Sequence, residues 1–166
     1  MKKTFVAVLA AASLMGIMPA QAVVTPLTTA QKAELKYLVE EEKLARDVYN
    51  YLAANVTSQK FSNIARSEQS HMDQVAALLK TYGVWNPTLN RKAGVFYDKS
   101  LQALYNQLIA EGSASVAAAF QAGVTIEQVD IADLEDDLKK DMPSDVVAVM
   151  TNLLRASQNH LAAFTR

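Results

Sequence analysis

The stretch "RSEQSHM", residues 66–72, places Glu68 and His71 three positions apart inside an apolar run. Side chains at positions i and i+3 lie on the same face of a helix. The chain has two histidines, and the second, His160, stands in another apolar run, "ASQNHLAAF" (156–164). The spacing of the apolar residues around these two stretches predicts the fold.

The composition of the 166-residue chain favours helices. Hydrophobic residues make up 51% of it, there are five glycines, and no alternation of apolar and polar residues indicates a strand. "TTAQ" (28–31) resembles a capping box, and Pro143 suits the first turn of a helix. We predict a short extra helix and four long helices, with the short one at 99–112 and the long ones at about 28–54, 58–82, 113–139 and from 143 almost to the C-terminus.

The links between these helices predict their arrangement. The links within the first and the last pair of long helices are short, whereas the segment 84–99, with Trp85 and Pro87, is too long for a hairpin turn. This pattern predicts an all-α four-helix bundle of two antiparallel hairpins, joined by a long crossover with the short extra helix. An up-down bundle with short links throughout fits less well.

Each long helix carries a stripe of positions, alternately three and four residues apart, that should face the core of such a bundle. The stripes of the first two helices are Leu35, Leu38, Glu42, Ala45, Tyr49, Leu52 and Phe61, Ile64, Glu68, His71, Val75, Leu78. Those of the last two are Phe120, Val124, Glu127, Ile131, Leu134, Leu138 and Val146, Met150, Leu153, Ser157, His160, Phe164. Every stripe is therefore interrupted by a carboxylate or an imidazole.

These interruptions predict a metal site. An ionised carboxylate inside a bundle costs several kcal/mol unless a cation neutralises it, and no stripe contains lysine or arginine. A bound metal is therefore a better source of positive charge than a salt bridge. Because the chain has no cysteine, oxygen and imidazole atoms must bind the metal. Such ligands suit iron, manganese or zinc and argue against Cu(I) and iron–sulfur clusters.

The positions match a known ligand arrangement of four-helix bundles, in which two helices give one glutamate each and the other two give a Glu-x-x-His pair each. Glu42 and Glu127 match the single glutamates, and Glu68 with His71 matches one pair. His160 matches half of the other pair, because Ser157 stands where its glutamate would be.

The missing glutamate affects the charge balance. Three carboxylates offset three of the four positive charges of two divalent ions, and Asp130, one turn after Glu127, would offset the fourth. Asp130 is therefore a sixth candidate ligand. There are two alternatives to Asp130 as the source of the fourth negative charge. Either a bridging hydroxide supplies it, or only one metal ion binds tightly.

Several neighbours of the candidate ligands have weaker interpretations. Tyr49, two turns from Glu42, packs in the core or acts as a hydrogen-bond donor or redox-active phenol, and packing is the favoured interpretation. Arg46 and Asp47 either support the site from outside or pair on the surface, and the surface pair is the favoured interpretation. Glu40 and Glu41 are expected to be solvated, although a shift of one position would make Glu41 the ligand.

The N-terminus resembles a secretory signal. Lys2 and Lys3 precede an apolar run, 5–18, and then "AQA", so cleavage is expected after Ala22 and the mature domain is 23–166. An uncleaved membrane anchor is the alternative. The formal charge, −1 for the whole chain, would become about −3, so neither nucleic acid nor a membrane is an expected partner after cleavage. The protein is predicted to be exported, either periplasmic or secreted.

Four motifs in order also resemble a known family. They are "EEEKLARDVY" (40–49), "NIARSEQSHM" (63–72), "GVTIEQVDIADLE" (123–135) and "SQNHLAAF" (157–164). They resemble the bacterial and archaeal ferritin-like family called domain of unknown function 2202. The first two are also similar, more distantly, to the first ligand helices of rubrerythrins, which aligns Glu42, Glu68 and His71 with metal ligands there. The resemblance implies a ferritin-like fold and a dinuclear iron-type centre, without a settled activity.

These observations predict an exported ferritin-like protein that holds two iron ions, with manganese or zinc as alternatives. The predicted chemistry is that of a ferroxidase- or peroxidase-type oxidoreductase, which oxidises Fe(II) or reduces oxygen or peroxide. Ser157 favours an alternative, a non-catalytic metal-binding or helix-mediated interaction module with a degenerate or mononuclear site. A zinc hydrolase fits less well because no general base remains outside the ligand set. A homodimer is expected by analogy with other bundles.

Overall fold

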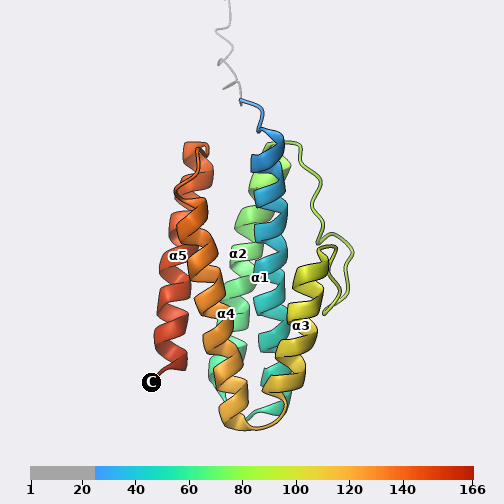
Figure 1. Ribbon diagram of the computed structural model, residues 1–166, viewed down its shortest axis with the longest axis vertical. Helices are drawn as coiled ribbons and strands as arrows, with labels where there is room; N and C mark the ends of the chain where they lie inside the picture. Colours follow the sequence, from blue (N-terminus) through green and yellow to red (C-terminus); the bar gives the residue numbers. More distant parts are fainter. Residues whose placement is uncertain (1–24) are drawn as a thin grey trace, which may run out of the picture.

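The computed structural model describes residues 25–166, which form five helices and no strand (Figure 1). The predicted all-helical bundle is confirmed for this part of the chain. The helices are α1 (Thr29–Asn55), α2 (Gln59–Thr81), α3 (Lys99–Gly112), α4 (Val116–Asp137) and α5 (Ser144–Phe164). Within the described range, no helix has both the length and the apolar content that a membrane span requires. The predicted signal, residues 1–22, lies outside the described residues.

Polar side chains fix where the helices begin. The predicted capping box of α1 is present, with the Thr28 side chain and Gln31 satisfying each other's backbone N–H groups. Ser115 accepts a hydrogen bond from the backbone nitrogen of Ala118 at 3.0 Å, so α4 begins at Val116 and not at residue 113. It ends at Asp137, two residues before the predicted end.

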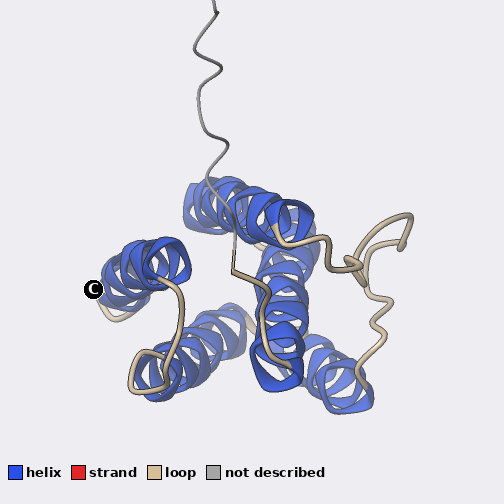
Figure 2. Ribbon diagram, turned by 90° about the horizontal axis from the view of Figure 1, so that it is seen from above, coloured by secondary structure: helices blue, strands red, loops and turns tan. Residues whose placement is uncertain are grey.

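The helices form two antiparallel pairs. α1 packs along α2 and α4 packs along α5, while α3 packs against α1 and α4. The end-on view shows the segment 82–98, which we call the crossover, standing out from one side of the bundle (Figure 2).

Two apolar clusters fill the bundle interior. One surrounds Tyr49 and Phe61 and reaches Phe164, and the other surrounds Leu38, Val75 and neighbouring residues of α4 and α5. On all four long helices, polar residues of the predicted stripes lie between the two clusters: Glu42 on α1, Glu68 on α2, Glu127 on α4 and His160 on α5. A polar layer therefore crosses the middle of the bundle.

The predicted stripe of α4 is partly wrong. Phe120, Val124, Ile131 and Leu138 are only partly buried, whereas the small residues Ala119, Ala122 and Gly123 are buried. The reason is α3, which packs against α4 and widens the face of α4 that is buried.

A buried ion pair attaches the crossover to α1. The Lys43 Nζ atom lies 2.5 Å from Asp47 Oδ2 and donates at 2.9 Å to the carbonyl oxygen of Lys92. Asp47 is 3% exposed and also accepts from the backbone of Gly94 at 2.9 Å. The predicted pair of Arg46 and Asp47 exists, at 2.7 Å. Its predicted surface location is wrong for Asp47, because the crossover covers that face of α1.

Candidate metal centre

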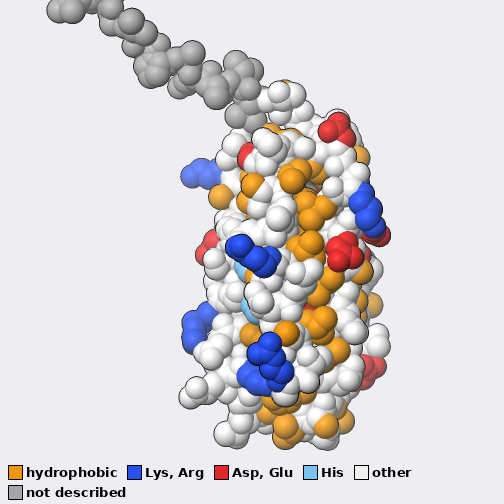
Figure 3. Space-filling model, turned by 90° about the vertical axis from the view of Figure 1, so that its left-hand side faces the viewer, with side chains coloured by type: hydrophobic (Ala, Val, Ile, Leu, Met, Phe, Trp, Pro, Cys, Tyr) orange, Lys and Arg blue, Asp and Glu red, His pale blue; other side chains and the backbone are white. Residues whose placement is uncertain are grey.

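The structure places the five predicted ligands of the stripes in the polar layer. Glu42 and Glu68 are each 2% exposed, Glu127 is 1% exposed and His71 is 4% exposed. His160 is partly buried. Histidine surface shows in a gap on the side of the bundle drawn in Figure 3, so one edge of the layer reaches solvent. The layer is thus enclosed, with access from one side.

Glu42, Glu68 and His71 form the first group of candidate ligands. His71 Nδ1 lies 2.6 Å from Glu68 Oε2 and 3.2 Å from Glu42 Oε2. Each of the three residues offers one ligand atom, and these atoms lie within 4.8 Å of one another. Two carboxylates and an imidazole from two helices therefore converge on a volume that one metal ion would fill.

Glu68, Glu127 and His160 form the second group, with the same 4.8 Å spread of ligand atoms. His160 Nδ1 lies 2.9 Å from Glu68 Oε1 and 3.7 Å from Glu127 Oε1. Glu68 belongs to both groups and presents one oxygen to each histidine. The two imidazole rings are stacked, with centroids 5.7 Å apart. The geometry is that of two adjacent sites sharing one carboxylate.

Three buried atoms of these groups lack a hydrogen-bond partner among the described residues: Glu42 Oε1, Glu68 Oε1 and His160 Nδ1. The last two are close together, but they do not face each other with hydrogen-bond geometry. Buried polar atoms without partners are rare and costly. Because all three are ordinary metal-ligand atoms, their donor chemistry fits iron, manganese or zinc.

Protons balance the charge of the layer when no metal is bound. Burial lowers the pKa of His71, but the hydrogen bonds and charges of Glu42 and Glu68 outweigh burial and raise it to about 10. The pKa of His160 is likewise lowered by burial and raised, to about 9, by Glu127 and Glu68. Burial raises the pKa of Glu68, but the two histidines outweigh it and lower the value overall. The metal-free layer therefore holds an anionic Glu68 between two imidazolium groups.

Asp130, the sixth candidate, lies at the edge of the layer and outside both groups of converging ligand atoms. It accepts a hydrogen bond from the hydroxyl of Ser157, which is 1% exposed. Burial, together with the charges of Glu127 and Glu68, raises the pKa of Asp130 to about 7 against the lowering effect of Ser157. The α4 carboxylate thus contacts the residue that stands where an α5 glutamate was expected.

Tyr49 has a more specific contact than the favoured packing interpretation predicted. Its side chain is fully buried and packs against Phe61 and Phe164. Its hydroxyl also donates a hydrogen bond to Glu127 Oε1 at 2.6 Å. Burial and the charge of Glu127 raise the pKa of Tyr49 well above its usual value, so the phenol stays protonated. Tyr49 therefore orients one of the candidate ligands.

The prediction that Glu40 and Glu41 are solvated is wrong. Glu40 is 2% exposed and accepts hydrogen bonds from the backbone nitrogens of Tyr97, at 2.5 Å, and Asp98, at 2.9 Å. Glu41 is 8% exposed and lines a small cavity between α1, α3 and α4 together with Asp130. Sequence reasoning missed both because α3 and the crossover cover this side of α1. A run of three glutamates, in a chain with a long link that carries Arg91 and Lys92, was the available signal.

Fold and centre together define a class of helical bundle with buried acidic and histidine groups that could hold metal ions. The comparison with known families is specific: the chain belongs to the family described as "Uncharacterized protein domain (DUF2202)", whose model matches residues 31–166.

The relatives found carry no assigned activity in their names. The chain is 43% identical over 141 residues to the uncharacterized protein MJ0754 of Methanocaldococcus jannaschii. The aligned residues make up 85% of this chain and 76% of that protein. The crystal structure of hypothetical protein MJ0754 from Methanococcus jannaschii DSM 2661 is similar to this fold, with a TM-score of 0.83 and 41% sequence identity. That similarity covers 87% of this chain and 83% of that chain.

Proposed function

We propose that this protein is a ferritin-like bundle that binds two transition-metal ions in its polar layer, iron in the first place and manganese or zinc as alternatives. Glu42 and His71 would bind one ion, Glu127 and His160 the other, and Glu68 both. The observation that carries the proposal is the set of three buried ligand atoms without hydrogen-bond partners. A metal ion in each group would satisfy all three.

The protein side chains prepare this site before a metal arrives. Glu68 presents its two oxygens to opposite sides, 2.6 Å and 2.9 Å from the two imidazoles, so one carboxylate serves both groups. The Tyr49 hydroxyl fixes Glu127 through a 2.6 Å hydrogen bond. The apolar clusters on either side of the layer keep bulk water away from the ligands. Such preorganisation lowers the cost of assembling a metal site.

Bound iron would supply one-electron redox chemistry with oxygen or peroxide as substrate. The chain has no cysteine and so no thiolate iron site of its own. Electrons for peroxide or oxygen reduction would come from a partner, or from Fe(II) itself when iron is the substrate. Export, inferred from the N-terminal sequence, would place this chemistry outside the cytoplasm.

The proposed ligand set is completed by Asp130. Two divalent ions carry four positive charges, of which Glu42, Glu68 and Glu127 offset three. Asp130 is held beside the polar layer by Ser157, so a rotation of its side chain could bring a fourth carboxylate to the metals. Replacing Asp130 with Asn should weaken binding of one ion more than that of the other, which stepwise metal titration would detect.

Metal analysis of protein prepared without chelator tests the proposal. We expect about two metal ions per chain after loading with Fe(II) under anaerobic conditions, and loss of both tightly bound ions in Glu68→Gln. Glu135→Gln is the matched control, because Glu135 is an exposed carboxylate of α4. Fewer than about 0.5 ions per chain in the unmodified protein would refute the proposal.

A second candidate function, a non-catalytic metal-binding module, is favoured by one observation. Ser157 and Asp130 hydrogen-bond to each other instead of supplying an α5 glutamate. Adding Fe(II) under air and following the near-ultraviolet absorbance of oxo-bridged ferric iron separates the two functions. Repeated turnover supports the redox function, whereas binding without turnover supports the module.

A further inference from the structure

The crossover exposes an unusual share of large apolar side chains. Among the described residues, six large hydrophobic side chains are exposed, and four of them belong to this segment. They are Trp85 (52% exposed), Leu89 (62%), Val95 (40%) and Tyr97 (61%). The rings of Trp85 and Tyr97 meet edge to face, with centroids 5.3 Å apart. We call these four side chains, with Arg91 and Lys92 between them, the crossover face.

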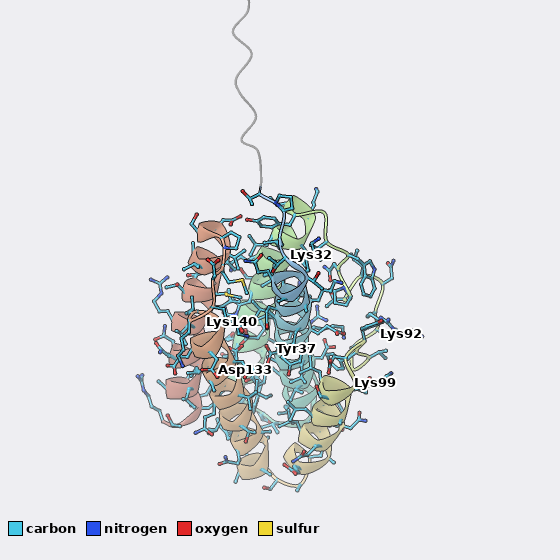
Figure 4. All side chains as sticks on the ribbon, turned by 45° about the horizontal axis from the view of Figure 1, so that its top comes forward. Lys32, Tyr37, Lys92, Lys99, Asp133 and Lys140 are labelled. Atoms are coloured by element: carbon cyan, nitrogen blue, oxygen red, sulfur yellow. The ribbon has the colours of Figure 1, made fainter. Side chains whose placement is uncertain are left out.

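Basic side chains lie beside the same apolar side chains, and so do the acids Glu34 and Asp98. The crossover contains Arg91 and Lys92 against Asp98, a net charge of +1 in a chain whose overall charge is −1, and Lys99 follows it as the first residue of α3. Lys36 of α1 lies 6.0 Å from the Trp85 ring, and Arg91 lies 5.9 Å from the Tyr97 ring. Figure 4 shows Lys92 on the outer side of the crossover and Lys99 at the start of α3. The net charge of the crossover is therefore positive, whereas the net charge of the whole chain is slightly negative.

The crossover is firmly attached to α1 by hydrogen bonds, although its apolar side chains on the crossover face are exposed. Lys43, Asp47 and Glu40 are all buried, and their side chains hydrogen-bond to the backbone of the crossover. The contacts are Lys43 to Lys92 O (2.9 Å), Gly94 N to Asp47 (2.9 Å), and Tyr97 N and Asp98 N to Glu40 (2.5 and 2.9 Å). Burying three charged side chains is costly unless they are fully paired. Here they hold the backbone of the crossover, with Phe96 buried in the core and Trp85, Leu89, Val95 and Tyr97 exposed.

We propose that the crossover face docks on an anionic phospholipid membrane surface. Tryptophan and tyrosine favour the membrane–water interface, aliphatic side chains favour the acyl region below it, and lysine and arginine favour anionic head groups. The crossover also stands out from the bundle, so it can reach a flat surface before the helices do (Figure 2). A second copy is a poorer occupant, because two such faces would repel each other.

The chain carries its own probe for this proposal, since Trp85 is its single tryptophan. Full-length protein is titrated with vesicles of phosphatidylcholine alone, or mixed with phosphatidylglycerol, while Trp85 emission is recorded. We expect a blue shift with the anionic vesicles, and quenching when their acyl chains are brominated. Each basic side chain near an anionic surface contributes about fivefold in affinity, so Arg91→Gln/Lys92→Gln should bind about 25-fold more weakly.

The matched control is Arg66→Gln/Arg155→Gln, which removes two exposed cations of α2 and α5. α5 lies on the opposite side of the bundle from the crossover (Figure 1). This variant should bind as the unmodified protein does. The N-terminal apolar run is common to all variants, so any difference between them reports on the crossover.

Three results would overturn the proposal. The first is equal Trp85 emission with neutral and anionic vesicles. The second is a blue shift that appears without vesicles as the protein concentration rises, which would assign the face to a second copy. The third is an equal shift with polyglutamate, which would assign it to an acidic protein partner.

Discussion

Metal binding to the polar layer should displace protons, and their number follows from the structure. His71 and His160 have pKa values of about 10 and about 9 in the metal-free protein. At pH 7 both imidazoles are therefore almost fully protonated, and a metal ligand must be deprotonated. Loading both sites at pH 7 should release about two protons from the imidazoles. Burial also raises the pKa values of Glu42 and Glu127, so these carboxyls can only add to that number.

The pH dependence has a definite sign. Raising the pH toward 10 removes these protons in advance, so the affinity for each ion should rise by up to about tenfold per pH unit while its imidazole is protonated. At pH 9.5, His71 is still about three-quarters protonated and His160 about one-quarter. The imidazole share of the released protons should therefore fall to about one.

Calorimetric titration with Zn(II), in buffers of different ionisation enthalpy, measures this release without redox chemistry. His71→Gln should reduce the release at pH 7 by about one proton, because Gln cannot carry it. Release of fewer than about one proton at pH 7, or the same release at pH 7 and 9.5, would refute the charge balance described here.

Three substitutions test the packing around the centre by urea unfolding of the metal-free protein. Tyr49→Phe removes the 2.6 Å hydrogen bond to buried Glu127 and should lower the free energy of unfolding by about 1–3 kcal/mol; no change would mean that water replaces the phenol. Lys43→Met removes one of the two cations that pair with Asp47, leaves Arg46 as the other, and should cost about 1–3 kcal/mol. The double variant with Asp47→Leu should cost less, and an additive loss would contradict the pairing. In Gly123→Ala the new Cβ would lie 2.8 Å from an aromatic ring of α5. Overpacking of about 1–3 kcal/mol should exceed the helix gain of about 1 kcal/mol, and a stabilised variant would contradict this.

The core-facing stripes of three helices could be predicted from the sequence. α1, α2 and α5 bury these stripes, and α1 also buries a second face under the crossover. Once those stripes align, Glu42, Glu68 and His160 must lie at the same height. The candidate site was therefore predictable from helical spacing, although its occupation by metal remains a proposal.

The remaining features depend on the path of the crossover and on α3, which no local pattern specifies. Glu40 and Asp47 are polar residues on a face of α1 that would be solvated in a bare four-helix bundle. They are buried because the crossover runs over them. Likewise α4 buries Ala119 and Ala122 beside α3, one and two positions away from the predicted stripe. Local periodicity cannot reveal a second packing partner.

Anomalous scattering from crystals of the iron-loaded protein tests the central claim most directly. We predict two peaks, one on each side of the Glu68 carboxylate, each about 2.0–2.3 Å from an imidazole nitrogen, one from His71 and the other from His160. Absence of any peak between the four long helices, with Glu68 still lying between two protonated imidazoles after loading, would contradict the claim. Buried protons alone would then neutralise the layer.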